Sequence, residues 1–132
     1  MLRRALLTLT LAAFAALPVT GRAAEGEKKP TPPRYLTIET LTVYTVRADR
    51  RRGVMTVDCG LDAPDPALYG RANALLPRLR AAYIETLQVY AGGLPAGYPP
   101  NPDYIGRSLQ RDTDQILGKP GARVLLGAIV EN

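Results

Sequence analysis

The stretch YLTIETLTVYTVRADRRRGVMTVDCGL, residues 35–61, decides the fold, because it reads as two β-strands joined by a turn. Thr, Val, Ile and Tyr, which fit a pleated surface, dominate both strands. In the second strand, Val54–Leu61, apolar and other residues alternate, and the inward set is Met55, Val57, Cys59 and Leu61. With Asp49–Gly53 as the turn, the stretch predicts an antiparallel hairpin with one face on the core.

The first strand, Tyr35–Ala48, does not alternate cleanly. One parity holds Leu36, Ile38, Tyr44 and Val46, and the other holds Leu41 and Val43. Two interpretations follow: the apolar side switches midway through a β-bulge, or both faces of the strand are partly covered.

A long amphipathic helix follows, with Asp65 as its cap and Pro66 at its first position. Its apolar face has spacings of three and four: Leu68, Ala72, Leu75, Leu76, Leu79, Tyr83, Leu87 and Tyr90. Its other side carries Arg71, Arg78 and Glu85. Pro77 interrupts the backbone bonding and predicts a kink or a restart, and Gly92-Gly93 ends the helix.

After the loop LPAGYPPNP, Asn101 caps a second helix that begins at Pro102 and stops at Gly118–Gly121. Its narrower stripe is Ile105, Leu109, Thr113 and Ile116. The final run, Arg123–Val130, is apolar on both parities, as in a central strand covered on both sides. The fold class is therefore α+β: a small antiparallel sheet, made of the hairpin and the C-terminal strand, packs against one long and one shorter helix.

The N-terminus, residues 1–24, has the layout of a secretory signal: Arg3-Arg4, an apolar run Ala5–Leu17, and small residues before Glu25. An apolar run of about 13 residues is short for a helix that needs roughly 20 to cross a bilayer. We expect cleavage and a periplasmic product, with an uncleaved inner-membrane anchor or a buried apolar helix as alternatives. The arginine pair also permits twin-arginine export. Residues 25–34 form a proline-rich tether outside the fold.

Charge gives no reason to expect nucleic acid or an anionic membrane as a partner. The whole chain carries a net charge of +5, but the part after the signal has 14 basic and 12 acidic residues. The cluster Arg50–Arg52 is read as a solvated hairpin tip rather than a phosphate site.

The residue inventory removes most catalytic chemistry. The chain lacks histidine, and its part after the signal has one serine, Ser108, and one cysteine, Cys59. Neither group has an imidazole to activate it, and a zinc site is equally hard to build. We therefore assign no catalytic, cofactor-binding or metal residues and expect no enzyme activity. Cys59 reads as a small buried hydrophobe rather than a redox thiol.

The carboxylates have structural interpretations. Asp112 and Asp114 lie two apart on a helix and point in different directions, whereas Asp58 and Asp62 flank a strand end and Asp65 caps a helix. Tyr98 and Tyr104 are expected to cover the core between the helices, with a partner-binding patch as the alternative.

Two segments, ALLPRLRAAYIETL (Ala74–Leu87) and ILGKPGARVLLGAIVEN (Ile116–Asn132), give the chain a family resemblance. Together with the preceding hairpin, they resemble the periplasmic domain of FliL, the flagellar basal-body-associated protein. The resemblance covers residues 35–132 and implies a stomatin-like α+β domain that self-associates beside the stator units of the flagellar motor. FliL proteins keep a membrane helix, whereas this N-terminal segment is short, and the loop Leu94–Asn101 is unusually proline-rich.

Three hypotheses about function follow. The first is an exported, non-catalytic FliL-like interaction module, able to form homo-oligomers, in the flagellar basal body, its stator or envelope assembly. The second is a free periplasmic small-ligand-binding or adaptor protein, with its pocket between helices and sheet beneath Tyr98 and Tyr104. The third, an enzyme using carboxylates alone, requires two converging buried acids.

Overall fold

The computed structural model describes residues 31–132, and the expected signal, residues 1–24, lies outside the described residues, as does most of the tether. Six elements follow one another along the chain: β1 (Tyr35–Val46), β2 (Arg52–Asp62), α1 (Pro66–Ala74), α2 (Leu76–Gly93), α3 (Pro102–Leu117) and β3 (Arg123–Glu131).

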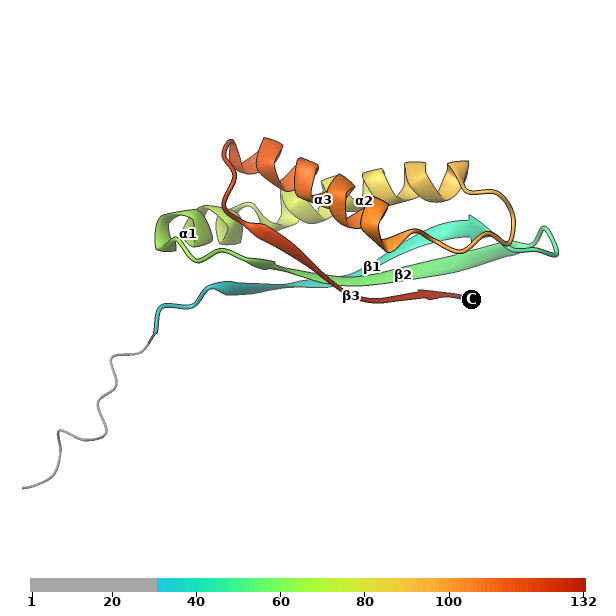
Figure 1. Ribbon diagram of the computed structural model, residues 1–132, viewed down its shortest axis with the longest axis horizontal. Helices are drawn as coiled ribbons and strands as arrows, with labels where there is room; N and C mark the ends of the chain where they lie inside the picture. Colours follow the sequence, from blue (N-terminus) through green and yellow to red (C-terminus); the bar gives the residue numbers. More distant parts are fainter. Residues whose placement is uncertain (1–30) are drawn as a thin grey trace, which may run out of the picture. The chain divides into compact units, whose positions relative to one another are not determined.

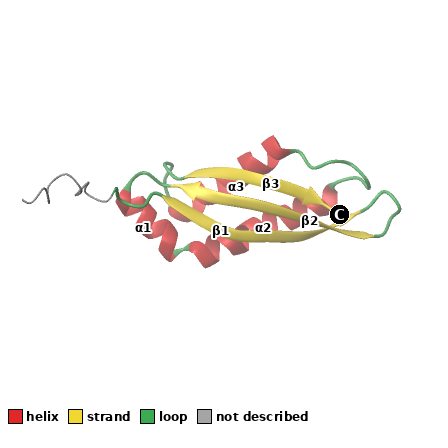
Figure 2. Ribbon diagram, turned by 90° about the horizontal axis from the view of Figure 1, so that it is seen from below, coloured by secondary structure: helices red, strands yellow, loops and turns green. Residues whose placement is uncertain are grey.

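The folded part has two layers. The three strands form one antiparallel sheet in the order β1-β2-β3, and all three helices lie on one face of it (Figure 1). Seen from below, the strands are in front, and no element of residues 31–132 covers them (Figure 2). The α+β class is therefore confirmed. The central position expected for the C-terminal strand is wrong, because β3 is an edge strand and β2 is central.

The parity switch in β1 is a β-bulge, the first of the two interpretations. Ile38 is opposite Cys59 and Leu41 is opposite Val57, so β1 holds one extra residue. This extra residue turns Leu41 and Val43 to the same face as Leu36 and Ile38, and all four are buried.

A second bulge lies on the other side of β2. Val57 is opposite Ile129 and Cys59 is opposite Leu126, so β3 also carries one extra residue at this level. Both bulges therefore flank Asp58 of the central strand, whose carboxylate accepts a hydrogen bond of 2.6 Å from Thr40 Oγ1.

The core fills the space between the sheet and the helices. Its largest fully buried side chains include Tyr83, Leu41, Met55, Leu61, Leu79, Leu87, Ile105, Leu109 and Leu117. The interpretation of Cys59 as a buried hydrophobe is confirmed, since 6% of it is exposed. Inside this core, the Tyr83 hydroxyl is hydrogen-bonded to Thr113 Oγ1, which donates in turn to the Leu109 carbonyl at 2.8 Å.

Local signals set the helix ends. Asp65 Oδ1 accepts from the Ala67 amide, and Asn101 Oδ1 accepts from the Asp103 and Tyr104 amides, so both predicted N-caps are confirmed. Pro77 produces a restart: Leu75 separates α1 from α2. Within residues 31–132, no helix is both long and apolar enough to cross a membrane.

The folded body begins one residue earlier than the tether prediction placed it. The Arg34 guanidinium donates two hydrogen bonds of 2.7 Å to the Asp62 carboxylate, and the Arg34 carbonyl accepts from the Ala63 amide at 2.7 Å. These contacts fix the chain at the start of β1. The guanidinium also lowers the pKa of Asp62.

Candidate functional site

The sheet face opposite the helices carries most of the exposed large apolar side chains of residues 31–132. We call it the outer sheet face; its outward residues include Tyr35, Thr37, Thr42, Tyr44, Val46, Val54, Thr56, Asp58, Leu125 and Val130. Five of the large apolar side chains on this face are exposed by 39–52%: Tyr35, Tyr44, Val46, Leu125 and Val130. The alternation along the strands that places one set of residues in the core places these five residues on the opposite face of the sheet.

Aromatic rings mark the two ends of the outer sheet face. At the hairpin end, Tyr44 lies opposite Val54, and the Arg52 guanidinium sits 4.5 Å from the Tyr44 ring centroid. At the other end, the Tyr35 ring covers Gly60, because a Cβ built on Gly60 would clash with the Tyr35 hydroxyl oxygen. Glycine at position 60 therefore leaves room for the Tyr35 side chain against the strand, and Leu125 is the cross-strand neighbour of Gly60.

Glutamine side chains form hydrogen bonds with backbone groups at both edges of the sheet. On β1, Gln88 of α2 accepts from the Tyr44 amide at 3.1 Å and donates to the Tyr44 carbonyl at 3.2 Å. On the β3 side, Gln110 of α3 accepts from the Val124 amide at 2.9 Å and donates to the Ala122 carbonyl at 2.7 Å. Each amide thus satisfies edge groups that another strand would otherwise bind.

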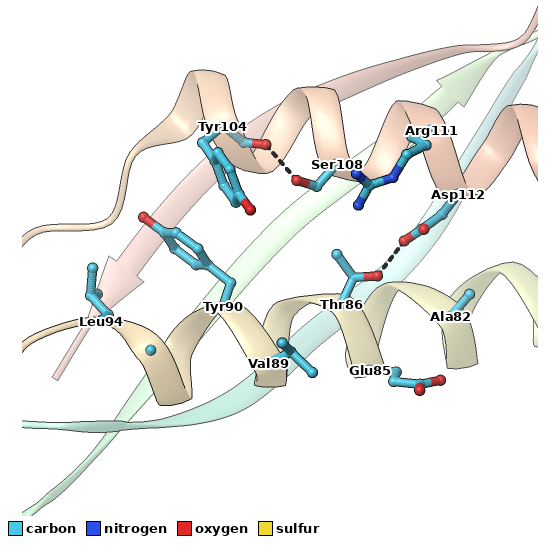
Figure 3. Close-up of a pocket in the computed structure, with 11 residues that line it drawn as sticks. Ala82, Glu85, Thr86, Val89, Tyr90, Leu94, Tyr104, Ser108, Arg111 and Asp112 are labelled. Carbon is cyan, nitrogen blue, oxygen red and sulfur yellow. Dashed lines mark hydrogen bonds between the residues drawn. The ribbon is translucent and has the colours of Figure 1, made fainter.

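A groove of about 590 Å³ separates α2 from α3 on the solvent side of the helical layer (Figure 3). Its polar end holds Glu85, Arg111 and Asp112, and Thr86 donates a 2.5 Å hydrogen bond to Asp112 Oδ2. At its other end the Tyr90 and Tyr104 rings stack with centroids 5.1 Å apart. The groove therefore offers an aromatic pair beside charged groups, a combination that suits a small polar ligand with an apolar part.

This groove is not the pocket that the second hypothesis expected, because it lies between two helices and not between the helices and the sheet. The lid interpretation is wrong for Tyr98, which is 62% exposed in the loop after α2. Tyr104 instead packs on Tyr90 at the end of the helix pair and is 47% exposed.

The paired aspartates of the second helix lie apart, as expected. Asp112 binds Thr86, whereas Asp114 accepts from Gln110 at 3.0 Å, so the two acids face different neighbours. Among residues 31–132, no carboxylate is buried and no group of three or more possible metal ligands comes together. The arginines 50–52 are exposed near the hairpin turn, as predicted.

Burial controls the ionisation of the single thiol. The pKa of Cys59 is raised to about 11, first by desolvation and then by the charge of Asp58. At neutral pH the side chain is therefore a protonated thiol inside the core and a poor nucleophile.

Sequence reasoning missed the uncovered face and the two edge glutamines. The apolar residues on both parities of β3 are a signal for the first, but the same pattern also fits a strand buried on both sides. Compared with known proteins, the chain matches no protein-family model, and no curated protein matches its sequence.

Proposed function

We propose that residues 35–132 form a non-catalytic interaction module that acts in the bacterial cell envelope, as the resemblance to the FliL periplasmic domain implies. The observation that carries this proposal is the outer sheet face, where five large apolar side chains are exposed and no helix of the described residues covers the strands (Figure 2). Water-exposed apolar surface of this kind is typical of protein interfaces, since its burial against a partner is favourable.

The chemistry of the outer sheet face points to a protein rather than a small molecule. Its apolar side chains are spread over three strands, with the threonines at 37, 42 and 56 between them and the charge of Asp58 near the centre. Tyrosine is enriched among the residues that anchor protein interfaces, so the Tyr35 and Tyr44 rings are the candidate anchors of this face. The partner class we propose is a component of the flagellar basal body or stator, or of another envelope assembly.

The test is site-specific photo-crosslinking in cells. A photoreactive residue in place of Thr37, on the outer sheet face, should crosslink to an envelope protein, and one in place of the exposed Arg78 on α2 should not. Identification of a stator or basal-body component at position 37, with impaired motility on deletion, supports the proposal. Unchanged motility with no motor component recovered from either position contradicts the motor role.

The groove between α2 and α3 favours a second candidate, a free periplasmic small-ligand-binding or adaptor protein. The stacked Tyr90 and Tyr104 at one end of the groove and Arg111 toward the other could hold the two ends of an aromatic anion by stacking and ion pairing. Titration with benzoate, followed by tyrosine fluorescence, should saturate if this candidate holds, and an Arg111→Ala variant should then lose the response. A linear response in both proteins excludes an anion site of this kind.

A further inference from the structure

The outer edge of β3 is open along its second half. Val124 points its amide away from β2, to Gln110, whereas Asn132 exchanges both backbone bonds with Val54 of β2. Residues of an antiparallel strand alternate between the two sides, and the bulge adds one residue to that alternation. Leu126, Ile129 and Glu131 therefore direct their amides and carbonyls outward, where no described residue bonds to them.

The β1 edge differs, because it is occupied near its end. Gln88 binds both backbone groups of Tyr44, and the Val46 carbonyl accepts from the Gly97 amide of the α2–α3 loop at 3.4 Å. An added strand therefore meets side-chain and loop contacts at β1, whereas the second half of β3 offers free donors and acceptors.

The open edge of β3 is complementary to itself. If two β3 strands run antiparallel with Leu126 opposite Ile129, the outward-facing groups of both residues meet and form four backbone hydrogen bonds. In this register the two-fold axis passes between Gly127 and Ala128, at the bulge. The extra residue then occurs at the same level in both strands, so neither strand loses its register.

The side chains match in the same register. Leu126 and Ile129 are opposite core-facing residues of β2, so both point to the helix side; Leu125 and Val130 both point to the outer sheet face. Across the two-fold axis, Leu126 would pair with Ile129 and Leu125 with Val130. Both pairs are apolar, and Leu125 and Val130 are exposed in the single chain by 39% and 44%.

Opposite charges would meet at each end of the paired strands. An open groove of about 520 Å³ runs between α3 and β3, and its lining includes Arg107, Arg123 and Val124. The register places Glu131 of the second copy opposite Val124, with its side chain on the helix side like that of Met55, its neighbour on β2. Its carboxylate would therefore enter beside Arg107. Asp103, the acid that also lines this groove, lies one turn earlier on α3, beyond Gly106 and away from Val124.

We propose that β3 pairs antiparallel with β3 of a second copy of this chain, with Leu126 opposite Ile129, to form one six-stranded sheet. Gln110 ends the ladder on each side, because its amide already holds Val124 and Ala122. A single strand pair buries less than the roughly 800 Å² per partner of a standard interface, so the dimer dissociates on dilution. The pairing is independent of the proposed envelope role.

Disulfide exchange between two variants tests the register. Leu125→Cys and Val130→Cys are made in separate proteins from the full chain, each with Cys59→Ala so that it holds one thiol. Their Cα atoms would lie about 4.5 Å apart in a non-hydrogen-bonded pair, which suits a disulfide. A mixture of the two proteins should form disulfide-linked dimers, and neither protein alone should do so.

The matched control mixes Leu125→Cys with Ala128→Cys, which would be opposite each other if the register slipped by two residues. Any pattern other than selective Leu125–Val130 crosslinking overturns the proposal: equal crosslinking of a single variant, crosslinking only to position 128, or none in any mixture.

Sedimentation equilibrium of the unmodified protein gives the second readout. It should show a reversible monomer–dimer equilibrium, and Glu131→Lys should raise the dimer dissociation constant by about tenfold or more, a loss of about 1.4 kcal/mol. Adding Arg107→Glu to Glu131→Lys should restore much of the affinity, whereas Glu85→Lys, on exposed α2 surface, should leave it unchanged. A protein that stays monomeric at millimolar concentration contradicts the proposed dimer.

Discussion

At the scale of single residues, the buried hydroxyls of Tyr83 and Thr113 form a hydrogen-bonded pair, and one of them has a second partner while the other does not. Thr113 Oγ1 donates to the Leu109 carbonyl and accepts from the Tyr83 hydroxyl, and both side chains are fully buried. The Tyr83 hydroxyl thus depends on Thr113, whereas the Thr113 hydroxyl keeps a partner without Tyr83. Burial of this hydroxyl also raises the pKa of Tyr83.

This asymmetry predicts two different losses of stability. Tyr83→Phe should lower the free energy of unfolding by about 1 kcal/mol, the net value of one hydrogen bond. Thr113→Val should cost about 1–3 kcal/mol, because it leaves a buried hydroxyl unsatisfied. Urea unfolding of both variants and of the double variant measures the difference. If Tyr83→Phe costs as much as Thr113→Val, the bonding scheme is wrong.

The Cys59 thiol should make the free energy of unfolding depend on pH in the alkaline range. Its pKa in the folded state is raised to about 11, above the ordinary value of 9.0, so the folded protein holds this proton more tightly than the unfolded chain. The stabilisation is complete below pH 9 and is lost as the pH rises through 11. Urea midpoints measured from pH 8 to pH 11 should fall, and Cys59→Ala should reduce that decline. An unchanged slope in Cys59→Ala would contradict a protonated, buried thiol.

At the scale of elements, the sequence predicts where each helix begins and ends better than it predicts which elements lie side by side. Asp65, Asn101 and the prolines after them act locally, and so does Gly118, which ends α3 with a left-handed φ of 79°. These residues set the helix ends through their own backbone, without help from distant contacts. The restart at Leu75 follows from Pro77 for the same reason.

The position of β3 in the sheet cannot be predicted from its local sequence. Val124, Leu126 and Ile129 pack under the helices, whereas Leu125 and Val130 point to the uncovered side. Apolar residues on both parities are therefore compatible with burial on two faces or with burial on one face and exposure on the other. Only the strand order, which depends on distant pairing, separates the two cases. The hydrogen bond between Gln88 and the Tyr44 backbone joins residues 44 positions apart, and the bond between Gln110 and the Val124 backbone joins residues 14 positions apart. No local sequence pattern predicts either bond.

The edge contact of Gln88 supplies a prediction about β1. Gln88→Ala removes both side-chain bonds to the Tyr44 backbone and should lower the free energy of unfolding by about 1 kcal/mol. It should also speed amide hydrogen exchange at Tyr44. The matched control, Gln115→Ala, changes an exposed glutamine on α3 and should leave exchange at Tyr44 unaltered. Equal exchange in both variants would show that Gln88 does not protect this edge.

At the scale of the whole molecule, the helices cover one face of the sheet, and no element among residues 31–132 covers the other (Figures 1 and 2). Sheets with one solvated face normally place polar residues on it. Here Tyr35, Tyr44 and Val130 lie among the threonines of the outer sheet face, so that face is more apolar than a solvated sheet face usually is. A partner that covers it would bury these residues, and pairing of two β3 edges would extend the same face across both copies.

The most direct test of a partner on the outer sheet face is the accessibility of a thiol placed there. Thr42→Cys and the helix-face variant Gln115→Cys are labelled with a membrane-permeable maleimide in intact cells and after purification, with buried Cys59 as the slow internal background. We predict that Cys at position 42 reacts in the purified protein but is protected in cells, whereas Cys at position 115 reacts in both. Equal labelling of position 42 in cells and in the purified protein would contradict a partner on the outer sheet face.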